Sequence, residues 1–133
     1  LHLSLRRQRQ MCIRDRVILD IGNGAELAAI ITNDSADHLA LEVGSEAYAL
    51  VKAQWIILTV ETNFKTSARN SLTGTVVRCQ EGAVNAEVVI ELPGGKTVAS
   101  IITNESVKTL GLKEGLRATA MIKASHIILA VPA

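Results

Sequence analysis

Short runs of alternating apolar and polar residues, separated by glycine turns, fill the second half of the chain. This period of two is typical of half-buried strands. It predicts five strands, at residues 72–79, 84–92, 97–103, 117–123 and 126–131. Between the third and the fourth, residues 104–110 have the pattern of one or two helical turns, with Thr103 or Asn104 as the cap. Five short strands and one small helix are typical of an OB-like barrel, so we expect an all-β fold.

A comparison of the chain with itself shows that the pattern occurs twice. Residues 17–60 align without a gap with residues 88–131, at an offset of 71, and 19 of the 44 aligned residues are identical. A match of this length and quality indicates a tandem duplication. We therefore expect two OB-like five-stranded barrels: a first module at residues 17–60 and a complete second module at residues 66–133, joined by a linker at residues 61–65.

The first sixteen residues, LHLSLRRQRQMCIRDR, are Arg-rich and differ in composition from the rest of the chain. They stand where the second copy has its opening TSARNSLTGTVVRCQEGAVNAE, and they contain no SARN, GTV or GAVN. One interpretation is a basic arm for nucleic acid; the other, which we prefer, is a disordered or foreign leader. We therefore expect the first module to lack its initial strand and hairpin, and residues 1–10 to be disordered or extended without core contacts.

Composition and charge argue against several classes of protein. The formal net charge is +1, and Tyr48, Trp55 and Phe64 are the whole aromatic set, which gives neither a basic groove nor stacking platforms for nucleic acid. No apolar run approaches the roughly 20 residues that a membrane helix needs, and no secretory signal follows the basic start. Cys12 and Cys79 are too few for a disulfide framework. A reducing cytoplasm is therefore the expected location.

Catalytic chemistry has little support. The three histidines are His2 in the leader, His38 on the helical segment, and His126, which aligns with Trp55 of the other copy and so indicates side-chain bulk rather than acid–base work. No Cys, His or carboxylate set has metal-ligand spacing, and no nucleophile motif occurs. We expect a protein that is not an enzyme, with no metal cation as a direct ligand and no organic cofactor.

Hydrogen-bond donors recur at the repeat offset. A Thr-x-x-Ser motif begins the small helix of each copy, and a Lys-Ala pair ends the fourth strand of each; the second copy adds a Ser-Ala-Arg-Asn motif and a serine after its Lys-Ala pair. Hydroxyl, ammonium and guanidinium groups beside a helix start are what a small oxyanion needs. The alternative is structural: the Thr and Ser cap a helix, the Lys ends a strand in solvent, and the Arg forms a surface ion pair.

The motifs TSARNSLTGTV, EGAVNAEV, ITNES and IKASHIILAVPA together resemble those of the molbindins, the Mop-type molybdate-binding domain proteins, over residues 17–133. The tandem arrangement is similar to that of the two-module molbindins. The resemblance implies an OB-derived barrel in each module and a homotrimer. It further implies molybdate or tungstate bound between modules of different subunits, and a role in cytoplasmic molybdenum storage or homeostasis.

The resemblance also implies the oxyanion ligands. In the second copy they are Ser67, Arg69, Asn70, Thr103, Ser106, Lys123, Ala124 and Ser125. In the first copy only Thr32, Ser35, Lys52 and Ala53 match. A weaker second site is expected at Ala83, Val84 and Asn85.

Two other functions stay open. One is the effector-binding portion of a molybdate-responsive transcription regulator, which would need a helix-turn-helix domain upstream. The other is an oligonucleotide-binding OB module, which the low aromatic content disfavours. The sequence does not separate molybdate from tungstate, nor does it exclude sulfate.

Overall fold

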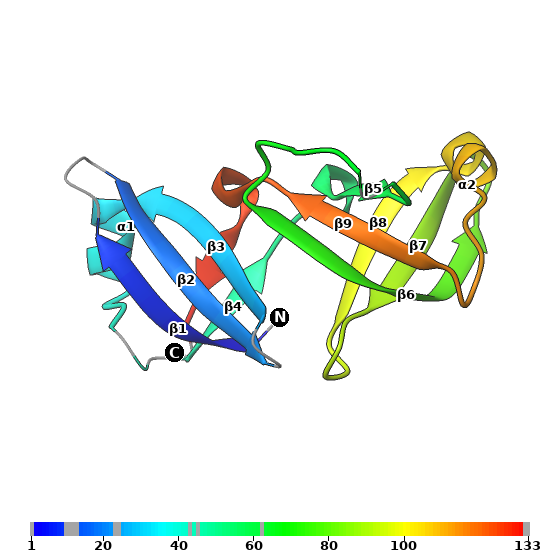
Figure 1. Cartoon of the computed structure of the whole chain (residues 1–133). Helices are drawn as coiled ribbons and strands as arrows, with labels where there is room; N and C mark the ends of the chain where they lie inside the picture. Colours follow the sequence, from blue (N-terminus) through cyan, green and yellow to red (C-terminus); the bar gives the residue numbers. More distant parts are fainter. Residues whose placement is uncertain are drawn as a thin grey trace. The chain divides into compact units, whose positions relative to one another are not determined.

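The computed structural model of the chain describes residues 2–9, 14–22, 25–42, 44, 46–61 and 63–131. Over these residues the fold is all-β, with short helices between strands (Figure 1). In chain order the elements are β1 (His2–Arg9), β2 (Arg14–Gly22), β3 (Ala25–Thr32), α1 (Asn33–His38), β4 (Glu46–Leu50), the 3-10 turn η1 (Ala53–Trp55), β5 (Ile57–Thr59), β6 (Asn70–Glu81), β7 (Asn85–Glu91), β8 (Thr97–Thr103), α2 (Asn104–Leu110), β9 (Arg117–Ile122), the 3-10 turn η2 (Ala124–His126) and β10 (Ile128–Ala130).

The chain forms two compact units, and each contains one five-stranded antiparallel sheet. Unit 1 comprises residues 1–51 and 123–133, with strand order β10-β4-β1-β2-β3. Unit 2 comprises residues 52–122, with strand order β5-β9-β6-β7-β8. Five short strands with one helix after the third match the expected OB-like barrel in each unit.

The compact units differ from the sequence copies, because the two copies exchange their last strands. β10, from the second copy, pairs with β4 in unit 1 (Ile128 opposite Leu50), while β5, from the first copy, pairs with β9 in unit 2 (Ile57 opposite Met121). We expected each module to be completed by its own last strand, at residues 17–60 and 66–133. Both copies carry Ile-Ile-Leu at this strand, so either sheet can accept either one, and the pattern does not reveal which.

The first sheet contains a strand that we expected to be missing. His2–Arg9 forms β1, which pairs with β2 and β4 in the place that β6 holds in unit 2. His2 lies opposite Tyr48 just as Thr73 lies opposite Thr119, so the repeat offset of 71 continues into the leader. The backbone of residues 2–9 is extended, which is one of the two conformations expected for the leader. The expectation that the first module lacks its initial strand is wrong for this backbone, and the expected lack of core contacts stays a prediction. The side chains of residues 2–9, and residues 1 and 10, lie outside what the structure describes.

The core of unit 2 follows the alternation seen in the sequence. Along β7, Ala86, Val88 and Ile90 are buried and their neighbours are more exposed. On β8 the completely buried Ser100 donates its hydroxyl to the carbonyl of Ile56, 2.9 Å away, which holds the segment after η1 against the edge of the sheet. A buried polar contact thus links the edge strand β8 to the residue that precedes the other edge strand, β5.

Two predicted elements have the expected bounds. The third strand of the complete copy, β8, and its helix, α2, span residues 97–103 and 104–110 as predicted. The turn after β7 uses Gly94 and Gly95 at φ +99° and +91°, which favours glycine, and Gly95 donates its N–H to Leu92. Among the described residues, no helix is long and apolar enough to cross a membrane.

Candidate functional site

The Thr-x-x-Ser motifs cap the two α-helices. Thr32 Oγ1 accepts the N–H of Ser35 at 3.1 Å, and its own hydroxyl donates to Ser35 Oγ at 2.9 Å. Thr103 and Ser106 repeat this geometry, with 3.1 Å for the N–H and 2.8 Å between the hydroxyls. Each motif thus satisfies one of the unpaired N–H groups of a helix start. The capping role is observed in both copies, and any ligand role comes in addition to it.

The expected second site adjoins the Thr-x-x-Ser motif of the second copy. Asn85 pairs with Thr103 across β7 and β8, and Asn104 donates its backbone N–H to Val84 and its side-chain amide to Gly82, both at 2.9 Å. The hairpin with Ala83, Val84 and Asn85 is exposed, Val84 by 69%. Asn85 and Thr103 were expected at separate sites. The structure places them side by side at one end of unit 2.

The Ser-Ala-Arg-Asn motif lies at the other end of the same sheet. β6 and β8 both run antiparallel to β7, so the start of β6 and the end of β8 are at opposite ends, separated by the 12 residues of β6. Ser67 and Arg69 are exposed, whereas Asn70 is only 2% exposed and donates its amide to the carbonyl of Ile122 at 3.2 Å. Asn70 therefore has a structural contact, and the exposed donors are Ser67 and Arg69.

Both lysines of the Lys-Ala pairs are exposed and precede a 3-10 turn. Lys123 directly follows Ile122, whose backbone pairs with Asn70, so the chain leaves β9 at the end where it enters β6. Lys52 precedes η1, and its Nζ lies 5.6 Å from the centre of the Trp55 ring. This cation–π contact was not anticipated, although a lysine three residues before a tryptophan was visible in the sequence.

The alanines beside these lysines differ in exposure. Ala124 is 2% exposed, and Ala53 is half-buried, with its carbonyl 3.5 Å from Ser100 Oγ. Any ligand contact at either alanine would have to use the backbone, because an alanine side chain donates no hydrogen bond.

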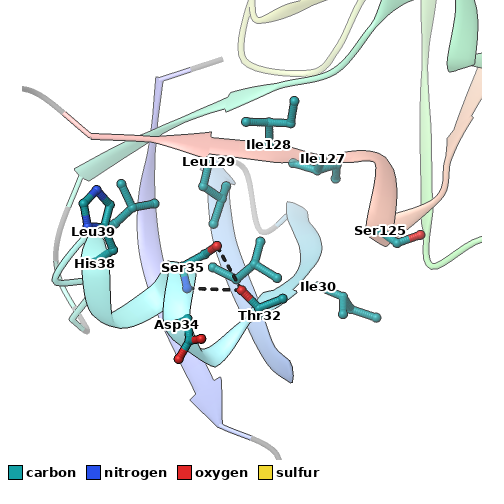
Figure 2. A pocket seen from close by; sticks show the side chains of 11 residues that line it. Ile30, Thr32, Asp34, Ser35, His38, Leu39, Ser125, Ile127, Ile128 and Leu129 are labelled. Atoms are coloured by element: carbon teal, nitrogen blue, oxygen red, sulfur yellow. Dashed lines mark hydrogen bonds between the residues drawn. The ribbon is translucent and has the colours of Figure 1, made fainter. Parts of the chain in front are cut away.

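A pocket of about 600 Å³ in unit 1 brings together three of the expected residues, Thr32, Ser35 and Ser125 (Figure 2). Its walls are otherwise mostly apolar, and they include the carboxylate of Asp34, which would repel an anion. Figure 2 shows the hydroxyls of Thr32 and Ser35 bonded to each other, with Ser125 on a separate segment. The pocket is lined by Ile30, Ile31, Thr32, Asp34, Ser35, His38, Leu39, Ser125, Ile127, Ile128 and Leu129.

Metal and thiol chemistry find little support in the described part of the chain. No three His, Cys, Asp or Glu side chains gather there into a set that could hold a metal ion. Cys79 is half-buried in β6, and burial, with smaller contributions from the carboxylates of Glu81 and Glu114, raises the pKa of its thiol. A thiol shifted in this direction is a poor nucleophile at neutral pH.

Comparison with known proteins gives a consistent result. Residues 10–58 and 66–129 match the TOBE domain. The chain is 47% identical over 116 residues to the molybdenum transport protein ModE of Azotobacter vinelandii, covering 87% of this chain and 42% of that protein. It is 40% identical over 121 residues to the molybdenum-pterin-binding protein MopA of Rhodobacter capsulatus, covering 90% and 46%. The chain thus spans less than half the length of these curated relatives.

A solved structure matches nearly the full length of the chain. The cytoplasmic molybdate-binding protein ModG, in a form with molybdate bound, superposes with a TM-score of 0.93 at 43% identity, over 98% of this chain and 94% of that one. A shorter relative, the molybdenum-pterin-binding protein 3 of Clostridium pasteurianum, is 49% identical over 63 residues, which is 47% of this chain and 93% of that protein. ModG is thus matched over both repeats of this chain, whereas the Clostridium protein has the length of one repeat.

Proposed function

The chain belongs to the TOBE-domain family, as a tandem Mop-type molbindin, and on that basis we propose that it binds molybdate or tungstate and serves in molybdenum storage or homeostasis. It acts as a binding protein in the cytoplasm and not as an enzyme. The observation that carries this proposal is the similarity, over nearly the full length of both chains, to a protein solved with molybdate bound. The donor groups of this chain support it independently.

These donors suit a tetrahedral dianion. Molybdate offers oxygen acceptors and no donor, and its desolvation demands several charge-assisted hydrogen bonds. Ser67, Arg69 and Lys123 present exposed hydroxyl, guanidinium and ammonium groups, and the capping hydroxyls of Thr103 and Ser106 are at least partly accessible. Ser67 and Arg69 precede the start of β6, whereas Thr103 and Ser106 lie at the end of β8. The two groups are therefore at opposite ends of the sheet of unit 2.

Since one sheet cannot bring both groups of donors to the same ligand, we infer that each oxyanion is bound between subunits of a homo-oligomer, a trimer in the arrangement we expect. Ser67 and Arg69 of one subunit would then face the Thr-x-x-Ser end of another. The remaining ligands, Lys52 with the backbone of Ala53 and Lys123 with the backbone of Ala124 and Ser125, would complete the sites. Thr32 and Ser35 are the first-copy counterparts of Thr103 and Ser106.

Calorimetric titration of the purified protein tests the function. Molybdate and tungstate should bind with a dissociation constant of about 1 µM or lower. Phosphate should bind much more weakly, because its protonated form brings a donor to a site made of donors. Equal affinity for phosphate, or no heat with molybdate at a concentration where the protein is oligomeric, would contradict the proposal. Light scattering in the same buffer gives the number of subunits.

A second function, the effector-binding portion of a molybdate-responsive regulator, is favoured by one observation: the 47% identity to ModE, of which the chain covers 42%. Such a regulator would carry a DNA-binding domain ahead of the tandem modules. The genomic sequence upstream of the codon for Val17 separates the two functions. An open reading frame encoding a helix-turn-helix domain there would favour the regulator.

A further inference from the structure

The two copies differ in the residue that lies three positions after their equivalent lysines. Lys52 and Lys123 are equivalent by the offset of 71, and both precede a 3-10 turn. Three residues later the first copy has Trp55 and the second has His126. Only the first copy can therefore place an indole, the strongest ring for a cation–π contact, beside its lysine.

The geometry around Lys52 places its ammonium group beside the indole ring of Trp55. Trp55 donates its backbone N–H to the carbonyl of Lys52 at 2.9 Å, which closes the turn and keeps the two residues together. The Lys52 Nζ then lies 5.6 Å from the centre of the indole ring, within the range of a cation–π contact. Trp55 is 44% exposed and Lys52 is exposed too, so the ammonium stays at the surface, where its donors can turn toward solvent.

We propose that Trp55 is a positioning residue, which orients the Lys52 ammonium for oxyanion binding and makes the lysine of the first copy a better ligand than that of the second. The inference rests on the proposed function. A free lysine side chain loses rotamer freedom when it binds an anion. A lysine already held against a ring has lost part of that freedom in advance, and its charge can still meet an anion on the side away from the ring.

The alternative is that Trp55 only packs against the aliphatic stem of Lys52 and contributes to folding. In that case, removal of the ring would lower the melting temperature and leave the affinity per folded protein unchanged. A positioning role predicts that loss of the Trp55 ring lowers the affinity for the ligand, and only while Lys52 is present. A packing role predicts no change in affinity.

Calorimetry with sodium molybdate on the full chain decides between them. Trp55→His, which gives the first copy the residue of the second, should weaken binding at the sites served by Lys52 by about two- to fivefold. Trp55→Phe should restore part of the loss. In a Lys52→Ala background, Trp55→His should cause no further loss, because the ring acts through the lysine. Tyr48→His, which removes another exposed aromatic ring, is the matched control and should leave the affinity unchanged.

Three outcomes would overturn the inference. An unchanged or tighter affinity in Trp55→His removes the positioning role, and an equal loss with and without Lys52 means that Trp55 does not act through it. A wild-type protein that binds no molybdate overturns the proposed function and this inference together. Binding by the wild type without any effect of Trp55 overturns this inference alone.

Discussion

Ala40 and Gly111 occupy the same left-handed backbone position, one after each α-helix, with φ +52° and +67°. They are equivalent by the repeat offset, and their N–H groups donate to the corresponding carbonyls of Asp37 and Lys108, at 3.1 and 3.2 Å. Left-handed φ values favour glycine, because a side chain there crowds the backbone. Ala40 is the one non-glycine residue with positive φ in the described part of the chain. The first copy therefore keeps the helix ending of the second copy with a less suitable residue.

Ala40→Gly should accordingly stabilise the protein, by about 1 kcal/mol, because relief of the strained conformation outweighs the added freedom of the unfolded chain. Gly111→Ala is the matched control and should destabilise by a similar amount. Urea denaturation of both variants checks the pair of signs. A loss of stability in Ala40→Gly would mean that the left-handed conformation costs nothing at this position.

Arg69→Ala and Lys123→Ala should weaken molybdate binding by several kcal/mol. The proposed site between subunits would bury these charges with the oxyanion, and a buried charge that loses its partner costs about 2–5 kcal/mol. Their melting temperatures should change little, because both side chains are exposed. Asn70→Ala should instead lower the melting temperature and change the molybdate affinity little, since its buried amide donates to the carbonyl of Ile122. We expect it to lower stability by about 1–3 kcal/mol. If Arg69→Ala unfolds the protein and keeps its affinity, the structural interpretation of the motif is correct.

Amide hydrogen exchange should be faster in β1 and β2 than in β6 and β7. At Gly74 of β6 a Cβ would stand 2.2 Å from the carbonyl oxygen of Glu91, so this close strand pairing requires glycine. The equivalent residue of β1 is Leu3. Strand pairing should therefore open more readily in the first sheet. Equal protection in both sheets, measured by mass spectrometry, would contradict the interpretation of the leader as foreign sequence.

Cys79 should react slowly with iodoacetamide in the folded protein. Burial, then Glu81 and Glu114, raise its pKa, so the thiolate forms at higher pH than in the unfolded chain. Because the pKa of the thiol is higher in the folded state, the protonated thiol stabilises the folded state below the unfolded pKa. This contribution to stability is lost as the pH rises from the unfolded pKa through the folded pKa. A Cys12→Ser variant isolates the reaction, and the rate in urea is the control. Faster alkylation in the folded state would show that the shift has the opposite sign.

The fold class and several element bounds could be read from the sequence because strand periodicity and helix capping are local. The exchange of β5 and β10 could not, because Ile57–Leu58 and Ile128–Leu129 are identical and the choice of sheet depends on the path of the connection. The strand at residues 2–9 was missed for a related reason. Backbone pairing with β2 and β4 does not require an alternating pattern, and an Arg-rich segment gives no such signal.

The residue types of the candidate site are taken from the sequence, and their role as ligands stays a prediction, whereas their grouping in space could not be predicted. The repeat offset singled out Thr-x-x-Ser and Lys-Ala, but it could not show that Ser67 and Thr103 lie at opposite ends of one sheet. Nor could it show that Asn70 is buried, since an asparagine in a polar motif resembles an exposed one until its partner, the carbonyl of Ile122, is known.

Strand exchange also sets the order in which the protein can form during synthesis. Unit 1 needs β10, which begins at Ile128, although β4 ends at Leu50. The 78 residue positions from Leu50 to Ile128 take roughly 4 to 16 s to translate at about 5–20 residues per second. During this time β4 has an unpaired edge at the position that β10 later fills. The second unit has β5 available before its own strands are made, so it can close first, and the earlier half of the chain is the last to be completed.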